Sequence, residues 1–296
     1  MKLYGGLGGS TECSIANSLW TDPEGRMQED FVGRCSGIFD AQVFQEDLSA
    51  PVIVPALNSW VSDHTAGMIP QIIQRPFGEG AAALMVNALY LKNTWAAKFD
   101  PSDTVTRDFT RADGAAEPLD FLQHFSRSLT YLQSGSDEGV LLPYDDGRLA
   151  FFALMPRQSS GVPDFERWLS SLTGEGLSAL LSGREETFFL RLSLPKFEQE
   201  WSGELKDALA ALGLTDAFDP DLADFSLLGD DPRGYYLSQV IHAARIEVNE
   251  EGTEAAAATV VAARPAPPAP GGRHPDLRPP LPLWHRGPAE RSAPCS

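Results

Sequence analysis

Two kinds of hydrophobic pattern follow one another along this chain. Apolar residues in short runs, or with the two-residue period of strands, cover 14–20, 84–91, 140–143, 149–155, 188–194 and 235–242. Apolar residues with the helical period cover 29–39, 51–64, 164–172, 176–181 and 203–212. The run 84–91 is almost entirely apolar, which is typical of a strand buried on both faces. This succession of strands and helices favours an α+β protein.

Turn residues support two of the boundaries. Asp145-Asp146-Gly147 separates two strand-like segments, and this sequence predicts a hairpin turn. Gly213 follows the last helix-like segment, where glycine is a common C-terminal cap. We therefore expect a hairpin at 145–147 and a helix end at Gly213.

The segment from Asn249 to Thr259 admits two local structures. Small uncharged residues fill alternate positions: Thr253, Ala255, Ala257, Thr259 and Val261. In a strand they share one face and could all point into a core, with Glu254 on the outward face. The alanines, with Thr253 as a cap, favour a helix when the segment is taken alone.

The composition disfavours several classes of partner. The chain has 296 residues, of which 43% are hydrophobic, and a net charge of −18 at pH 7. Nucleic acids and anionic membranes attract basic surfaces, so neither is expected as a partner. No apolar stretch has the length of a membrane span, and the first residues contain no run of signal-peptide length. The three cysteines have no metal-binding spacing, and we expect neither a metal nor a cofactor.

Catalysis is a weak alternative. His64, His124 and His242 could in principle serve a catalytic triad, and Asp145-Asp146 could form a carboxylate pair. None of them lies in a recognised pattern such as Gly-x-Ser-x-Gly or His-Glu-x-x-His. We therefore expect no catalytic residues.

Several motifs, which occur in order along the chain, resemble one family. The segment 240–259 contains Glu250-Glu251-Gly252-Thr253-Glu254 and four alanines, and it closely resembles the hinge of the inhibitory serpins. The further segments that resemble serpin motifs are 14–20, 85–95, 99–101, 194–197 and 205–220. The resemblance runs from about Leu3 to Thr259 and covers most of the chain.

The resemblance implies the serpin fold, with a large central mixed β-sheet, smaller sheets and surrounding helices. It also implies a serine protease inhibitor that acts as a suicide substrate: the protease forms an acyl-enzyme with an exposed loop, and the cut loop inserts into the central sheet. The implied target is a serine protease, with a cysteine protease as the alternative. The implied state is an extracellular or cell-surface monomer, although the chain shows no signal peptide.

The resemblance assigns roles to individual residues. The hinge comprises Glu250, Glu251, Gly252, Thr253, Glu254, Ala255, Ala256, Ala257, Ala258 and Thr259. Gly252 is expected to give the chain freedom to turn, and Thr253 to enter the sheet first. Asn87 and His242 match a polar pair where the two central strands separate. Trp95 matches a packing residue at the point of first insertion.

Two positions are candidates for the scissile bond. The family's usual distance from Gly252 places the bond after Ala266, before Pro267. Arg264-Pro265 lies two residues earlier and would suit a trypsin-like protease. A proline after the cleaved bond resists most serine proteases, so both positions meet the same objection.

The two ends depart from the family pattern. The serpin helices that precede the 14–20 strand have no counterpart before Met1, and two long apolar strands are missing after the loop. Residues 264–296 hold ten prolines and five arginines, and we interpret 1–263 as a partial serpin domain followed by a Pro/Arg-rich tail. Codons for 276–295 can be chosen so that reading one nucleotide later yields a serpin-like Arg-Pro-Phe-Leu-Phe string. We therefore hypothesise a frame disruption between Val261 and Asp276.

A non-inhibitory or inactive serpin-like fragment is the alternative function. The alanine-rich hinge argues against a carrier or chaperone-like member, because such members tend to carry bulky or charged residues there. The missing segments argue for the product of a decayed gene, an inactive fragment that would be at most a binding or structural protein.

Overall fold

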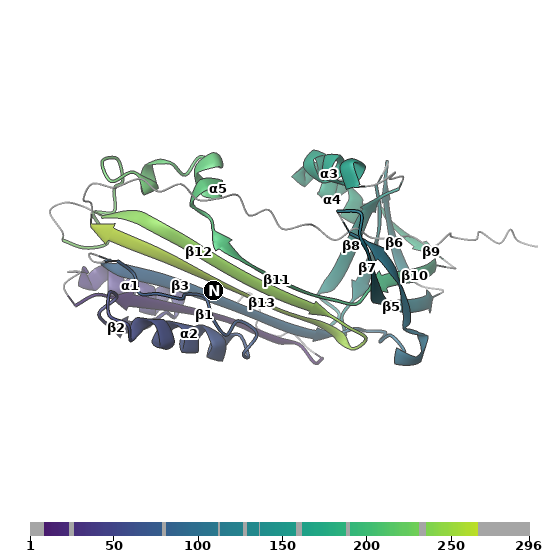
Figure 1. Cartoon of the computed structure of the whole chain (residues 1–296), viewed down its shortest axis with the longest axis horizontal. Helices are drawn as coiled ribbons and strands as arrows, with labels where there is room; N and C mark the ends of the chain where they lie inside the picture. The colour runs from purple at the N-terminus through teal and green to yellow at the C-terminus, as the bar shows by residue number, and fades with distance from the viewer. Residues whose placement is uncertain are drawn as a thin grey trace, which may run out of the picture.

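A large mixed sheet forms the body of the molecule (Figure 1). The computed structural model describes residues 9–23, 27–78, 81–111, 113–126, 129–135, 137–157, 162–187, 190–230 and 235–265. The strands of the large sheet are β1 (Glu12–Thr21), β2 (Gln42–Gln45), β3 (Ala83–Thr94), β11 (Phe197–Glu204), β12 (Tyr235–Val248) and β13 (Gly252–Pro265). Their order is β11-β12-β13-β3-β1-β2. β1 and β2 are parallel, and the other neighbours are antiparallel.

Two smaller antiparallel sheets stand at one end of the large sheet, at the right of Figure 1. The first has the order β10-β5-β4, with β4 (Val105–Thr110), β5 (Ala116–Ser126) and β10 (Leu190–Pro195). The second has the order β8-β7-β6-β9, with β6 (Leu129–Ser134), β7 (Asp137–Pro143), β8 (Ala150–Pro156) and β9 (Arg184–Thr187). β7 and β8 form the expected hairpin, and Gly147 in its turn has the positive φ that favours glycine.

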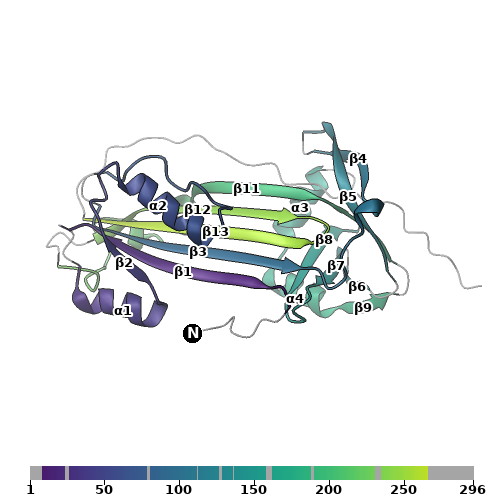
Figure 2. The ribbon, with the colours of Figure 1, turned by 90° about the horizontal axis from the view of Figure 1, so that it is seen from below.

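Five α-helices and two short 3₁₀ helices accompany the sheets in the described residues. They are α1 (Glu29–Phe39), α2 (Ile53–His64), α3 (Val162–Ser171), α4 (Gly174–Ser182), α5 (Lys206–Ala211), η1 (Pro101–Asp103) and η2 (Asp216–Phe218). Figure 2 shows α2 lying across one face of the large sheet, and Figure 1 shows α5 on the opposite side. Among the described residues, none of the helices has the length and apolar character that a bilayer span requires.

The main core lies between α2 and the large sheet. The apolar stripe of α2 is buried, as its helical spacing predicts, and Ile53 and Leu57 have no exposed surface. It packs against alternate residues of the sheet, among them Val86 and Ala88 of β3. The part of this layer formed by α2 and β3 comes from one stretch of sequence, and β13 adds Ala256, Ala258, Val260 and Ala262 from a distant one.

Two sequence-based predictions are wrong. β3 is buried mainly on the α2 face, since Asn87 and Leu89 on its other face are exposed; no described element covers the middle of that face. The helix expected at 203–212 begins only at Lys206, because Gly203 and Glu204 extend β11 and pair with β12. Gly213 does end that helix, with a φ of 103°.

The fold class is confirmed, since one large mixed sheet, smaller sheets and surrounding helices make up an α+β protein. The proposed boundary at 263 stays a prediction. Residues 266–296 lie outside the described residues, as does most of the interval from Val261 to Asp276 in which the frame disruption is proposed.

Candidate functional site

β13 fills the space between β3 and β12 (Figure 2). Its ladder with β3 runs from Gly252, opposite Thr94, to Ala263, opposite Ala83. Its ladder with β12 continues as far as Pro265. Two flanking ladders override the helix preference of the alanines, because tertiary context outweighs local propensity. Of the two local structures that the sequence admits, the strand is confirmed and the helix is wrong.

The family resemblance predicts an exposed loop at this place before cleavage. In this structure the chain runs without a break from β12 through Asn249 into β13. The segment is therefore a central strand of the uncut chain, and the structure describes the arrangement with this strand in the sheet.

The two faces of β13 are buried to different extents. Ala256, Ala258, Val260 and Ala262 belong to the core beneath α2 and are at most 4% exposed. In the other register Thr253 is buried, but Ala255, Ala257, Thr259 and Val261 are only half-buried. The expectation that this second set fills the core is wrong for its middle part, because α2 covers the opposite face. Glu254 lies on the α2 face and not on the outer one.

A row of polar residues crosses the middle of the uncovered face. Asn87 pairs with Asn17 on one side and with Thr259 on the other, and Thr259 pairs with His242. Asn87 Nδ2 donates to Asn17 Oδ1 over 2.9 Å, and His242 Nδ1 lies 2.7 Å from Thr259 Oγ1. Asn87 and His242 thus flank β13 rather than meet each other. Asn17 lies in the 14–20 segment that resembles a serpin motif, but the sequence assigned it no role of its own.

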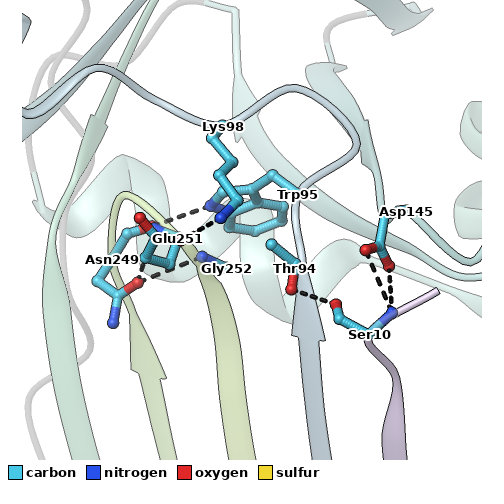
Figure 3. A network of polar contacts seen from close by, with 8 residues as sticks. All are labelled: Ser10, Thr94, Trp95, Lys98, Asp145, Asn249, Glu251 and Gly252. Atoms are coloured by element: carbon cyan, nitrogen blue, oxygen red, sulfur yellow. Dashed lines mark hydrogen bonds and ion pairs between the residues drawn. The ribbon is translucent and has the colours of Figure 1, made fainter.

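A turn at Asn249 leads from β12 into β13 (Figure 3). Asn249 Oδ1 accepts hydrogen bonds from the backbone N–H groups of Glu251 and Gly252, over 2.9 and 3.2 Å. This side-chain acceptor replaces a backbone partner, a common use of asparagine in turns. Asn249 therefore fixes the start of the strand, a role that the sequence analysis did not assign.

Gly252 has a steric reason to be glycine. A Cβ on this residue would lie 1.9 Å from the carbonyl oxygen of Asn93 and 3.0 Å from the Cα of Thr94. Both contacts are with backbone, which cannot move away without breaking the β3 ladder. The close approach of two backbones explains this glycine better than freedom to turn.

Trp95 holds the turn against the end of the large sheet. Its Nε1 donates to the carbonyl oxygen of Asn249 over 2.9 Å, and its backbone N–H donates to Glu251 over 3.0 Å. The indole is buried and stacks on Tyr144 with ring centroids 5.0 Å apart. Trp95 therefore packs beside the first residues of β13, where the family resemblance places it.

Glu250 is anchored by two neighbouring elements. Lys196 Nζ lies 3.0 Å from one carboxylate oxygen, and Thr104 Oγ1 donates to the other over 3.0 Å. Partial burial acts to raise the pKa of Glu250, but the hydrogen bonds from Lys196 and Thr104 stabilise the carboxylate and hold the pKa below its ordinary value. The carboxylate is thus charged and tied down beside the turn.

The other two hinge glutamates each meet a lysine as well. Glu251 forms an ion pair with Lys98 (Figure 3). Glu254 Oε2 lies 3.4 Å from Lys92 Nζ, and its Oε1 accepts from the Tyr90 hydroxyl over 2.8 Å. Burial, followed by the hydrogen bond to Glu254, raises the pKa of Tyr90. These contacts explain how a charged residue is accommodated within β13.

The two candidate scissile bonds lie at or beyond the end of β13. Arg264 pairs with Tyr236, and its guanidinium lies against Gly78, where a Cβ would be 2.3 Å from an Arg264 nitrogen. Pro265 is the last described residue of the strand, and Ala266 and Pro267 lie outside the described residues. Arg264 is thus part of the inserted strand in this structure.

The histidines and aspartates of the catalytic alternative are not brought together. His64 stacks on Trp60, and His124 lies edge-on to Phe99 with ring centroids 5.6 Å apart. Asp145 accepts from the backbone N–H of Ser10, and Asp146 accepts from the backbone of its own turn. Each group has a separate structural partner. Within the described residues no cluster of three His, Cys, Asp or Glu side chains could hold a metal.

Comparisons with known proteins agree on one family. A family model described as Serpin (serine protease inhibitor) matches residues 3–272. Serpin B10 of Sorex araneus is 33% identical over 204 residues, 68% of this chain and 50% of that protein. Serine protease inhibitor 42Dd of Drosophila melanogaster is 31% identical over 251 residues, 84% of this chain and 65% of that protein.

A solved structure agrees with the sequence relatives. The thermophilic serpin tengpin in the latent state matches with a TM-score of 0.74 and 30% identity, over 85% of this chain and 67% of that one. The chain spans about half to two thirds of the length of the relatives it matches. With the family match extending over residues 3–272, on a fold that has this strand order and this hinge, the chain belongs to the serpin family.

Proposed function

We propose that this protein inhibits serine proteases as a suicide substrate and is not itself an enzyme. The nucleophile of the protease attacks a peptide bond near the C-terminal end of the 252–265 segment, and an acyl-enzyme forms as the amine of the next residue leaves. The cut segment moves between β3 and β12 before water hydrolyses the ester. The attached protease is carried along and its active site is deformed.

The energy for this movement comes from adding a strand to the sheet. A strand held by ladders on both sides gains backbone hydrogen bonds that are worth about 1 kcal/mol each in net terms, so the insertion releases on the order of 10 kcal/mol. Burial of Ala258 and Val260 beneath α2 adds to this gain. Small side chains suit a strand that must slide under a helix already in place.

The pairing of β13 with both neighbours is the observation that carries the proposal. A segment that is paired with both β3 and β12, with one register shift at Leu237/Gln239, and whose Glu254 is paired with Lys92 is compatible with the final state of such an inhibitor. The turn at Asn249 and the steric requirement at Gly252 support the same interpretation.

One observation favours a second candidate function. β13 lies in the sheet although the chain is uncut. A form that keeps this segment inserted offers a protease no accessible peptide bond there. Such a chain would be a non-inhibitory or inactive serpin-like protein that acts in binding or structure. The two candidates differ in whether the segment is exposed before cleavage.

Incubation with a panel of serine proteases tests the proposal. We expect a covalent complex that survives SDS with at least one of trypsin, chymotrypsin, elastase and subtilisin, and no complex with the same protease after its active serine has been blocked. If every protease of the panel cleaves the loop, turns over freely and forms no complex, the inhibitory function is rejected and the second candidate is favoured. A panel of papain-like cysteine proteases tests the alternative target class.

The remaining assignments follow from the same proposal. We place the protein outside the cell or on its surface as a monomer whose partner is the target protease, with no nucleic acid and no membrane involved. We assign the inhibitory domain to 1–263 and treat 264–296 as a separate tail. Secretion of the full-length protein and its mass in solution would check these points.

A further inference from the structure

The lysines of this chain are concentrated around the hinge. The sequence contains only five lysines, against 41 acidic residues. Three of them form ion pairs with hinge glutamates: Lys196 with Glu250, Lys98 with Glu251 and Lys92 with Glu254. Of the other two, Lys2 lies outside the described residues, and Lys206 at the start of α5 lies over the ring of Phe218.

The three lysines surround the point where β13 enters the sheet. Lys92 projects from β3, Lys98 from the loop that follows β3, and Lys196 from the connection between β10 and β11. They therefore come from both sides of the gap between β3 and β12. Their glutamate partners, Glu250, Glu251 and Glu254, lie at the leading end of the inserted segment.

The pairs of Lys92 and Lys98 are too exposed to stabilise the protein much. The lysine side chains are 51% and 54% exposed, and exposed ion pairs contribute little to stability. Opposite charges nevertheless speed the approach of the groups that carry them, an effect that salt screens over about 10 Å at 0.1 M. Pairs of this kind are therefore better suited to steering than to holding.

We propose that Lys92 and Lys98 are positioning residues that steer the hinge into the sheet, Lys92 by attracting Glu254 and Lys98 by attracting Glu251. This inference rests on the proposed inhibition, in which insertion competes with hydrolysis of the acyl-enzyme. The outcome of that competition is a ratio of two rates, so faster approach of the hinge raises the yield of complex. Once Glu254 has entered the sheet, the Tyr90 hydroxyl donates a hydrogen bond to its carboxylate.

The inference predicts a salt-dependent yield. The variant Lys92→Gln/Lys98→Gln should release about threefold more cleaved inhibitor per complex formed than the wild type at low salt. Raising the salt to 1 M should bring the wild type close to the variant and leave the variant almost unchanged. Lys206→Gln removes the same charge far from the hinge and should behave like the wild type. The thermal stability of the uncut variants should match that of the wild type.

A charge exchange tests the specific pair. Lys92→Glu and Glu254→Lys should each lower the yield of complex, and the double variant should restore most of it. Equal yields in wild type and the Lys92→Gln/Lys98→Gln variant at all salt concentrations would overturn the inference while leaving the inhibition intact.

The inference remains testable if no complex forms at all. In that case the proposed inhibition fails, and the steering is measured on the loop alone. Subtilisin cuts the loop, and hydrogen exchange then follows the rate at which residues 253–261 become protected. If these amides become protected about threefold more slowly in the Lys92→Gln/Lys98→Gln variant than in the wild type at low salt, the steering is supported. Identical rates, or protection already complete before the cut, overturn it.

Discussion

The imidazole Nδ1 of His242 lies 2.7 Å from Thr259 Oγ1, across the boundary between β12 and β13. This contact joins a residue of the permanent sheet to one of the segment that we propose to be mobile. Burial lowers the pKa of His242, since desolvation disfavours the charged ring. The burial of His242 beside the inserted strand therefore makes the stability of this arrangement sensitive to pH.

The stability of the inserted form should fall in mild acid. An unfolded chain takes up a proton on this residue near pH 6.5, whereas the folded form resists it until a lower pH. Stability is therefore greatest above about pH 6.5 and is lost as the pH falls toward the folded-state pKa, by about 1.4 kcal/mol for each unit between the two pKa values. Urea unfolding of the cleaved protein at pH 7.5 and 5.5 measures this difference.

His242→Gln should reduce that pH dependence. Burial also lowers the pKa of His124, so His124→Gln is a suitable companion variant that removes a second contribution of the same sign. An unaltered pH dependence in His242→Gln would show that this histidine does not couple to the sheet.

Thr253→Arg should convert the inhibitor into a substrate. Thr253 is only 4% exposed and lies between Val248 and Asn93. A long charged side chain at this place cannot be buried without a partner, so insertion slows and the acyl-enzyme hydrolyses first. SDS gels should show cleaved inhibitor in place of complex. Thr253→Val keeps the volume without the charge and should retain most of the complex, and a full yield of complex from the arginine variant would reject the insertion account.

Gly252→Ala should destabilise the inserted form. The added Cβ would meet the carbonyl oxygen of Asn93 at 1.9 Å, and overpacking of this kind costs about 1–3 kcal/mol. The cleaved protein should lose roughly 2–10 °C in Tm. Gly33→Ala is the matched control: Gly33 lies within α1 with open space around it, so alanine should stabilise the helix slightly. A cleaved Gly252→Ala protein as stable as the wild type would contradict the close approach of the two backbones.

Aspartate at neighbouring alanines should distinguish the two faces of β13. Ala258 has no exposed surface beneath α2, and Ala258→Asp should destabilise the inserted form by about 3–5 kcal/mol. Ala257 is half-buried on the other face, where Ala257→Asp should cost much less. Thermal unfolding of the two cleaved variants compares them directly. The opposite ranking would mean that the assignment of the faces is wrong.

Local patterns predict much of the fold, because they depend on residues close together in the chain. The helix predicted at 29–39 is α1, and the strand predicted at 14–20 is the middle of β1. Predictions that depend on distant contacts fare less well. Which face of β13 is covered depends on α2, which lies about 190 residues earlier in the sequence. The ends of β11 and α5 depend on pairing with β12 in the same way.

The candidate site shows the same division. The hinge and Trp95 carry local motifs, so the sequence alone can propose them, and in the structure Trp95 does contact the turn at the start of β13. The lysine partners of the hinge glutamates carry no such local motif, since Lys92, Lys98 and Lys196 are between 54 and 162 residues away from them in the chain. The role of Asn17 is missed for the same reason, because its partner Asn87 lies 70 residues away. Asn249 is different: its side chain bonds to the backbone two and three residues further on, so the turn preference of asparagine was a local signal for it.

Hydrogen exchange of residues 253–261, measured before and after a protease cuts the loop, tests the central claim most directly. The structure has the segment paired in the uncut chain, whereas the proposed inhibitor must first hold it outside the sheet. The account therefore predicts that the uncut protein also adopts this second form, with fast exchange of these amides, and that cleavage brings strong protection as they pair with β3 and β12. Fast exchange in both states would mean that the segment never inserts. Protection already complete in the uncut protein would mean that the loop is not available as bait, and the inhibitor assignment would be contradicted.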